Sequence, residues 1–84
     1  SQNTKPSFDC AKASTNAEKI VCSDDELARL DNELANAYKN ALNSLDNASK
    51  KQLTNEQKSW LKTYNQCTDK ECVKYHLQMR IWAL

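Results

Sequence analysis

Hydrophobic positions in the central part of the chain repeat with the period of an α-helix. A step of about 100° per residue over positions 24–45 places the apolar side chains within an arc of roughly 140°. This apolar face consists of Leu27, Leu30, Leu34, Ala37, Tyr38, Ala41, Leu42 and Leu45. The opposite face consists of Arg29, Asn32, Glu33, Asn36, Lys39, Asn40 and Asn43. The pattern predicts a long amphipathic helix that buries one side, as a helix of a small bundle does.

A second amphipathic segment covers about 50–66. Its apolar stripe, with Gln57 in the middle, is made of Leu53, Trp60, Leu61 and Tyr64. The other side carries a row of lysines, namely Lys51, Lys58 and Lys62. Such a row is typical of a solvated face. We therefore expect a helix that contacts the rest of the bundle through the stripe alone.

The last segment, about 70–84, has two apolar stripes on different sides. One stripe is made of Val73, Leu77, Ile81 and Leu84, and the other of Tyr75, Met79 and Trp82. A single helix of a small bundle rarely buries both. Two interpretations of the second stripe stand side by side: Trp82 folds over the open end of the core, or the stripe is a contact surface for a partner or a second copy.

Helix start signals indicate the same fold. A Ser or Thr followed three residues later by Glu or Gln is the capping-box pattern, and it recurs along the chain. The pairs are Thr15 with Glu18, Ser23 with Glu26, Ser49 with Gln52, and Thr68 with Glu71. Glycine is absent and the sole proline is Pro6, so tight hairpin turns lack their usual residues. The sequence predicts an all-α fold, a small bundle of three main helices plus a short N-terminal helix.

The length of 84 residues predicts one domain whose core alone leaves stability marginal. We expect residues 1–7, a polar stretch, to form a disordered mature N-terminus. Residues 8–84 are then a single helical domain. No apolar run approaches the roughly 18 residues of a membrane span. The chain begins with Ser1, and we expect that a signal peptide has been removed.

The four cysteines indicate a disulfide framework and an oxidising compartment, because their number is even and the chain is short. Three pairings are open. We favour local bridges, Cys10 with Cys22 and Cys67 with Cys72, because each pair flanks a short connection at a helix boundary. The alternatives are reduced thiols or a zinc site that also uses His76. The cysteine spacing lacks the paired knuckles of structural zinc sites, so we expect no metal.

Charge and residue types exclude several classes of protein. The net charge of +1 argues against a nucleic-acid-binding domain, although the first half of the chain is acidic and the second basic. His76 is the only histidine, so the usual pairing of a nucleophile with a base has no obvious members. No glycine-rich loop is present to hold a nucleotide. We expect no catalytic residues and no cofactor.

One charged residue interrupts the apolar face of the long helix. Asp31 lies inside the arc, and burying a lone carboxylate is costly. Arg80 lies at the edge of an apolar stripe in the last segment. We therefore predict a structural pair, a charge-assisted bond between Asp31 and Arg80 that ties two helices together.

Motifs over most of the chain resemble a known family. They are Phe8-Asp9-Cys10, Glu18-Lys19-Ile20-Val21-Cys22-Ser23, Glu26-Leu27-Ala28, Leu30-Asp31, Glu33-Leu34, Ala37-Tyr38, Gln57-Lys58-Ser59-Trp60-Leu61, Asn65, Cys67, Cys72-Val73 and Arg80-Ile81. This pattern over residues 8–84 resembles the LprI-like lysozyme-inhibitor family of bacterial secreted and lipid-anchored proteins. The resemblance implies an α-helical, disulfide-bonded envelope protein that inhibits host-type lysozyme. The chain departs from the family pattern at Tyr64, where an arginine is common, and at Leu77, where a tyrosine is common.

These observations predict a non-enzymatic, periplasmic or secreted bacterial binding protein, a monomer or weak homodimer, whose protein partner is a lysozyme-type muramidase. Lysozymes are commonly basic, so the candidate partner-binding surface is acidic and consists of Asp24, Asp25, Glu26 and Glu33. A rival hypothesis is a structural or accessory envelope protein that assembles through Tyr75, Met79 and Trp82. A third class, a carboxylate-based hydrolase, requires two acids that converge in a pocket.

Overall fold

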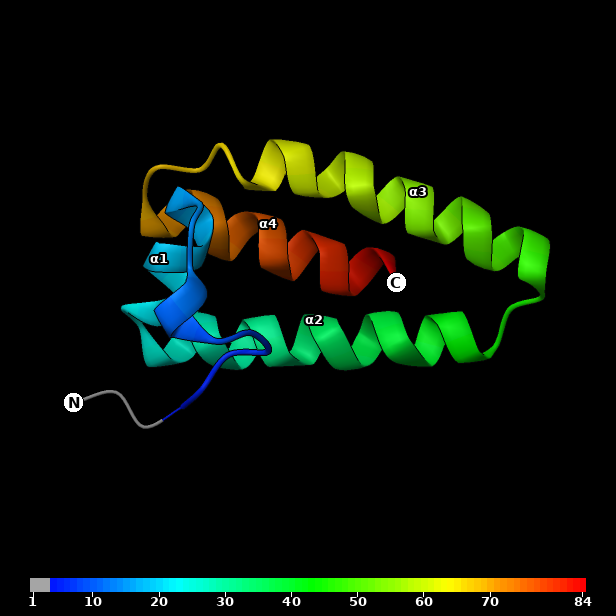
Figure 1. Cartoon of the computed structure of the whole chain (residues 1–84), viewed down its shortest axis with the longest axis horizontal. Coiled ribbons are helices and arrows are strands. Elements are labelled where there is room, and N and C mark those ends of the chain that lie inside the picture. The colour runs from blue at the N-terminus through cyan, green and yellow to red at the C-terminus, as the bar shows by residue number, and fades with distance from the viewer. Residues whose placement is uncertain (1–3) are drawn as a thin grey trace.

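The computed structural model describes residues 4–84, and within that range every regular element is helical (Figure 1). The elements are a short 3-10 helix η1 (Cys10–Lys12) and the α-helices α1 (Asn16–Cys22), α2 (Asp25–Asn43), α3 (Asn47–Tyr64) and α4 (Lys70–Ala83). The predicted all-α fold, with three main helices and a short N-terminal helix, is confirmed over the described residues.

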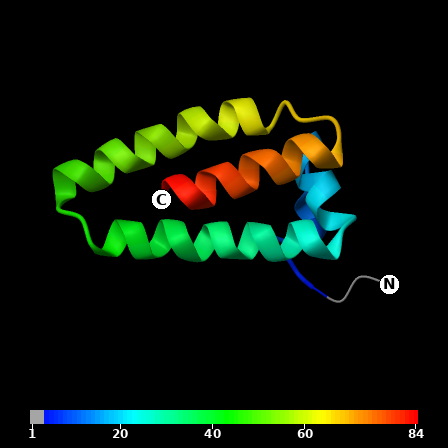
Figure 2. The same ribbon diagram turned by 180° about the vertical axis from the view of Figure 1, so that it is seen from behind.

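The helices form an elongated bundle of 41 × 24 × 23 Å. α2 and α3 run antiparallel, and α4 lies between them in both views (Figures 1 and 2). α4 packs on α2 and on α3, while α1 packs across the end of the bundle at which α2 and α4 begin. Among the described helices, none combines the length and apolar character that crossing a membrane requires.

N-caps explain where each α-helix begins. α1 has the predicted capping box, in which the Thr15 hydroxyl accepts the N–H of Glu18 and the Glu18 carboxylate accepts the N–H of Thr15. The other three predicted boxes are wrong, because aspartates cap those helices: Asp24 for α2, Asp46 for α3 and Asp69 for α4. A carboxylate accepts the free N–H groups of the first turn, and its charge complements the positive end of the helix dipole.

The core lies at the end of the bundle where α1, α2 and α4 meet. Its fully buried residues are Ala17, Val21, Leu27, Ala28, Leu34, Tyr64, Cys67, Val73 and Leu77. None of residues 35–63 is fully buried. The part of the α2–α3 hairpin that is remote from α1 is therefore packed more thinly than the rest.

α4 buries one of its two predicted stripes. Val73 and Leu77 are fully buried, whereas Tyr75, Met79 and Trp82 are 60, 47 and 82% exposed. Trp82 therefore does not cover the open end of the core, and that interpretation is wrong. The second stripe is an exposed surface.

Two disulfides close short loops, and the predicted local pairing is confirmed. Cys10 is bonded to Cys22, which ties η1 to the last turn of α1. Cys67 is bonded to Cys72, which ties the α3–α4 connection to the first turn of α4. No cysteine of the chain is free.

The N-terminal segment lies along α2. The Asp31 carboxylate accepts hydrogen bonds from the backbone N–H and the hydroxyl of Ser7, both at 2.6 Å. Asn32 donates to the carbonyl of Lys5 at 2.6 Å, and the N–H of Thr4 donates to Asp25. Residues 1–3 lie outside the described residues. Disorder over 1–7 stays a prediction, but residues 4–7 have specific polar partners on α2.

Candidate functional site

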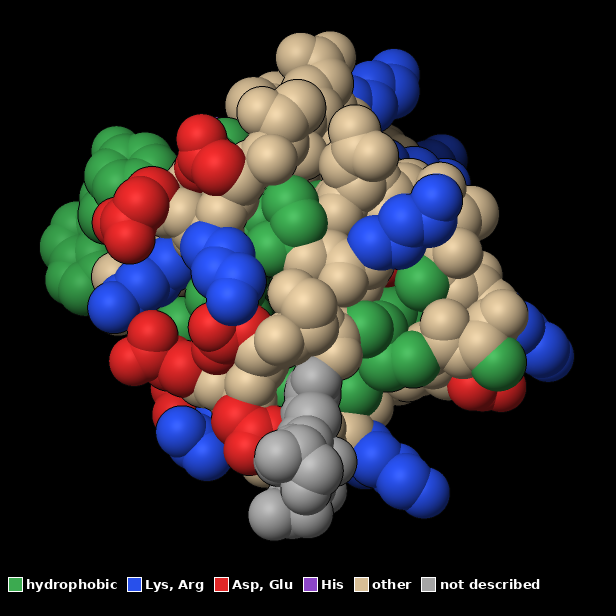
Figure 3. Space-filling model, turned by 90° about the vertical axis from the view of Figure 1, so that its left-hand side faces the viewer, with side chains coloured by type: hydrophobic (Ala, Val, Ile, Leu, Met, Phe, Trp, Pro, Cys, Tyr) green, Lys and Arg blue, Asp and Glu red, His purple; other side chains and the backbone are tan. Residues whose placement is uncertain are grey.

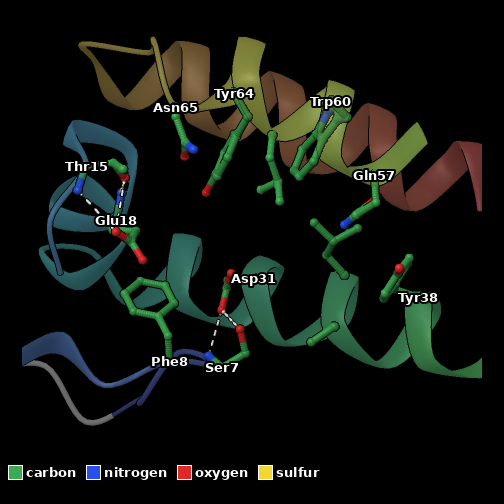
Figure 4. A pocket seen from close by; sticks show the side chains of 13 residues that line it. Ser7, Phe8, Thr15, Glu18, Asp31, Tyr38, Gln57, Trp60, Tyr64 and Asn65 are labelled. Carbon is green, nitrogen blue, oxygen red and sulfur yellow. Dashed lines mark hydrogen bonds between the residues drawn. The ribbon is translucent and has the colours of Figure 1, made fainter. Parts of the chain in front are cut away.

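A cleft of about 400 Å³ opens between the N-terminal segment, α1, α2 and α3 (Figure 4). This volume falls within the roughly 300–1,000 Å³ that is usual for ligand sites. Phe8 enters the cleft from the N-terminal segment, Tyr38 from α2, and Trp60 and Tyr64 from α3. The Trp60 and Tyr64 rings are stacked, with centroids 4.6 Å apart and planes inclined by 13°. The cleft is therefore aromatic on several sides.

Two carboxylates line the same cleft, one from each of two helices. Glu18 of α1 accepts the backbone N–H groups of Ser14 and Thr15, each at 3.1 Å. These two hydrogen bonds lower the pKa of Glu18, so this carboxylate is ionised at neutral pH. Asp31 of α2 is held by Ser7. Because all of these donors are neutral, the hydrogen bonds fix the carboxylates in place without cancelling their charges.

The hydroxyl of Tyr64 points into the cleft (Figure 4). Tyr64 is only 5% exposed, yet its hydroxyl forms no hydrogen bond with any described residue. Burial, and after it the negative charges of Asp31 and Glu18, raise the pKa of Tyr64. The phenol therefore stays neutral and protonated, beside two anionic groups.

The other end of the cleft connects to α4 through Gln57. The side-chain carbonyl of Gln57 accepts a 2.8 Å hydrogen bond from Nε of Arg80. Nearby, the Tyr38 hydroxyl lies 3.4 Å from the hydroxyl of Thr54, which itself donates to the carbonyl of Lys50. Gln57 interrupts an apolar stripe because it serves this contact with α4.

The predicted pair between Asp31 and Arg80 is wrong. Asp31 faces the cleft, where Ser7 satisfies it, and Arg80 donates to Gln57. Neither residue belongs to an ion pair within residues 4–84. One guanidinium nitrogen of Arg80, Nη2, is buried without a hydrogen-bond partner among the described residues. The helical pattern identified Asp31 as inward-facing, but the N-terminal segment, not α4, supplies its donors.

We expect Asp31→Ala and Arg80→Ala to destabilise the protein independently. Their effects on the free energy of unfolding should add to within about 0.5 kcal/mol, because the two side chains share no partner. Urea titrations of the wild type, both single variants and the double variant give the coupling. A coupling on the order of 2 kcal/mol, as expected for a direct buried contact, would contradict the arrangement described.

The predicted acidic surface at the start of α2 is partly neutralised. Asp24 lies 3.2 Å from the ammonium of Lys70, and Glu26 lies 3.3 Å from that of Lys74. Figure 3 shows acidic and basic side chains next to one another at this end of the molecule. The hydrogen bond from the Leu27 N–H, and after it the one from Lys70, lower the pKa of Asp24, which is the N-cap of α2. These acids serve the helix start and the contact between α2 and α4.

The remaining residues predicted to bind a partner have different surroundings from one another. Asp25 accepts a hydrogen bond from the N-terminal segment, and Glu33 is exposed on α2 without an ion pair in the described part of the chain. Tyr75, Met79 and Trp82 share the exposed side of α4. None of these residues lines the cleft.

Within the described residues, one group of potential metal ligands is present, and two of its members are bonded to each other in a disulfide. Cys67, Cys72 and His76 have side-chain donor atoms within 4.8 Å of one another. Both sulfur atoms are bonded to each other, so they are not thiolates. His76 Nδ1 lies 2.8 Å from the carbonyl oxygen of Cys72, which can only accept, so this nitrogen carries the proton.

The sequence patterns do not predict the cleft. They indicate a capping box at Glu18, an ion pair at Asp31 and an apolar stripe at Tyr64. A signal existed, because Asp31 and Gln57 are polar residues inside the apolar faces of consecutive helices. Two such interruptions indicate a polar cavity that both helices border.

The fold and the cleft define a small disulfide-bonded all-α protein with an acidic, aromatic-lined cleft. Within that class, the chain belongs to the family described as lysozyme inhibitor LprI, whose family model matches residues 10–80. The resemblance inferred from the motifs is therefore confirmed. This is a family of inhibitors and not of enzymes, and its name implies a protein partner such as lysozyme. Comparisons with curated proteins and with solved structures found no match.

Proposed function

We propose that this protein is a secreted or periplasmic bacterial binding protein that inhibits a lysozyme-type muramidase and does not catalyse a reaction. Membership of the lysozyme inhibitor LprI family over residues 10–80 carries this proposal. Two disulfides agree with an oxidising compartment outside the cytoplasm. The open, aromatic-lined cleft agrees with a binding role.

The surroundings of Glu18 do not favour a role as the proton donor of a hydrolase. A carboxylate-based hydrolase needs one acid whose pKa is raised, so that it can donate a proton at neutral pH. Glu18 has the opposite property, because backbone N–H groups lower its pKa. Glu18 and Asp31 border one cleft, but Glu18 is not suited to act as the general acid.

Steering by acidic residues remains part of the proposal. Asp24, Asp25, Glu26 and Glu33 lie along the first half of α2, and their field would accelerate encounter with a basic partner. Because Asp24 and Glu26 are paired with lysines of α4, we assign most of the steering to Asp25 and Glu33.

A lysis assay tests the function directly. We expect the purified protein to slow the lysis of bacterial cell walls by a lysozyme in proportion to the complex formed, with neither component cleaved. The assay should be accompanied by calorimetric titration of the protein with lysozymes of the animal, invertebrate and bacteriophage classes. Binding should weaken as salt is raised, since screening reduces the attraction between opposite charges.

Lys51→Gln, a charge change on the exposed side of α3 and away from the acidic residues of α2, serves as the control. This variant should inhibit as the wild type does. Titrations that show no saturable heat with any of the three lysozyme classes would refute the assigned partner. Mass spectrometry of the assay mixture should find both proteins at full length.

A second candidate function is assembly into an envelope structure through Tyr75, Met79 and Trp82. The exposure of these three large side chains along one side of α4 favours it. Sedimentation velocity separates the two candidates. Self-association that Trp82→Ser abolishes would support assembly, whereas a monomer at all concentrations leaves lysozyme binding as the function.

A further inference from the structure

The cleft between α1, α2 and α3 is negatively charged, and no residue of the described range 4–84 forms an ion pair inside it. Glu18 and Asp31 line it, and no lysine or arginine is among its lining residues. Neither acid takes part in an ion pair within residues 4–84. Among the other acids of α2 and its N-cap, Asp24 and Glu26 each have a lysine partner, whereas Asp25 and Glu33 have none within the described residues.

Both carboxylates are held in fixed positions. Glu18 is fixed by the backbone of Ser14 and Thr15, and Asp31 by both donors of Ser7. A ligand that binds between them need not order these side chains, which reduces the entropic cost of association. The donors leave lone pairs on the carboxylate oxygens free to accept further hydrogen bonds.

The Tyr64 hydroxyl is an independent indication of a ligand. It is a polar group of a residue that is 95% shielded from solvent, it points into the cleft, and no described residue hydrogen-bonds to it (Figure 4). The hydroxyl is not among the fully buried side-chain atoms that lack a partner, so it is open to the cleft and its oxygen can accept a ligand N–H. The raised pKa of Tyr64 reflects the same surroundings, because the charges of Asp31 and Glu18 that disfavour a phenolate would favour a cation.

The walls of the cleft restrict the kind of cation. Trp60 and Tyr64 are stacked, and Phe8 and Tyr38 add two further rings. Aromatic faces attract guanidinium and ammonium groups and pack against the apolar stems that carry them. A hard metal ion would instead require a shell of oxygen ligands, and within residues 4–84 no group of three or more acidic, histidine or cysteine side chains converges in the cleft.

We propose that this cleft binds an organic cation, a guanidinium or alkylammonium group, presented as the end of an arginine or lysine side chain of a protein partner. The carboxylates of Glu18 and Asp31 accept its N–H groups, the Tyr64 hydroxyl accepts another, and its stem packs along Trp60. A planar guanidinium fits best, because it can hydrogen-bond to a carboxylate and stack on a ring at the same time. The inference rests on the proposed function only for the identity of the protein that carries the side chain.

The site is tested first with small probes. The oxidised 84-residue chain is titrated with N-acetyl-arginine amide and, separately, with the citrulline analogue, which has the same shape without the charge. The indole N–H signal of Trp60 is followed by NMR and is assigned with a Trp60→Phe variant. We expect a saturable shift with the arginine probe. The citrulline analogue should bind with an affinity at least roughly tenfold lower, since the charge-assisted hydrogen bonds are missing.

Isosteric variants locate the binding. Asp31→Asn and Glu18→Gln keep an acceptor oxygen for Ser7 and for the capping box, so the fold should persist, but each removes a charge. Each should weaken the arginine probe by roughly tenfold, and Tyr64→Phe by about threefold. Glu56→Gln, which removes a charge on the exposed side of α3 outside the cleft, is the matched control and should bind as the wild type does. Circular dichroism verifies that each variant is folded.

Three results would overturn the proposal. Equal affinity for the arginine and citrulline probes would exclude a cation site. Equal binding by Asp31→Asn and the wild type would place the cation elsewhere. Saturation by an N-acetylglucosamine oligosaccharide, with no response to the arginine probe, would make the cleft a carbohydrate site.

A second arm identifies the source of the cation. Lysozyme is titrated into the wild type and into Asp31→Asn, and we expect the variant to bind it roughly tenfold more weakly. If the wild type and Asp31→Asn bind lysozyme with equal affinity, the occupant is not a side chain of lysozyme. If a free polyamine such as spermidine saturates the cleft far below the concentration needed for the arginine probe, the occupant is not a protein side chain. If lysozyme binds neither the wild type nor Asp31→Asn, the proposed function fails. The probe titrations still show whether the cleft binds an organic cation.

Discussion

The Leu77→Ala variant should lose about 3–4 kcal/mol of unfolding free energy. Leu77 is fully buried in α4, at the place where α4 packs between its neighbours. Truncation of a buried leucine removes its transfer free energy and leaves a cavity, which together cost about 2–5 kcal/mol. A domain of this size is stable by only about 5–10 kcal/mol, so the variant should be close to unfolding at physiological temperature. Urea denaturation followed by circular dichroism, with the disulfides intact, measures the loss.

Leu61→Ala is the matched control, because Leu61 is a leucine of α3 that is 37% exposed. It should lose less than about 1.5 kcal/mol, since less apolar area is buried there. The slope of the free energy against urea should be unchanged in both variants. Equal losses at the two positions would mean that the core does not lie between α1, α2 and α4.

Removal of the Cys10–Cys22 bridge should cost about 3 kcal/mol. The bridge joins residues separated by 12 positions, and closing a loop of this length restricts the unfolded chain by about that amount. Cys10 is exposed, so replacing both cysteines by alanine removes little packing at that end of the bridge. The double variant Cys10→Ala/Cys22→Ala is compared with the oxidised wild type by thermal and urea unfolding.

The fully reduced wild type should lose more than this variant, because its Cys67–Cys72 bridge opens as well. That second loop spans a separation of 5 and should contribute about 2 kcal/mol. A loss below about 1 kcal/mol on removal of the first bridge would indicate that the reduced, unfolded chain keeps the two cysteines near each other.

Features that depend on local sequence were predicted well. The periodic leucines of α2, the absence of glycine and the cysteine spacing led to the correct fold class and the correct disulfides. Each of these signals acts over a few residues or through one helix face. The caps of α2, α3 and α4 were predicted wrongly because Ser23, Ser49 and Thr68 compete with aspartates nearby, and an ionised carboxylate is the stronger acceptor beside a helix dipole.

Features that depend on how separate elements meet were not predicted. The pattern placed Asp31 on the inward face of α2, but a periodicity cannot specify which element lies opposite. The polar composition of residues 1–7 predicts disorder, whereas in the structure Ser7 supplies both donors to Asp31. The cleft lies between α2 and α3. On one side α4 separates these two helices, and on the other side the side chains of α1 and of residues 7–8 do so. The sequence of any single segment does not specify this arrangement of elements around the cleft.

The uneven distribution of buried residues means that different parts of this molecule open at different free-energy cost. Both disulfides and all the buried side chains of the core lie outside the stretch 35–63, which runs from the middle of α2 through the α2–α3 turn to the last turn of α3. Opening of that part exposes little apolar surface, so it requires less free energy than global unfolding. Tyr38 and Gln57 belong to this less stable part, whereas Trp60 packs against the core and Glu18 and Asp31 lie on the segments anchored to it. The end of the cleft at Tyr38 and Gln57 can therefore adjust to a ligand while the charged end keeps its shape.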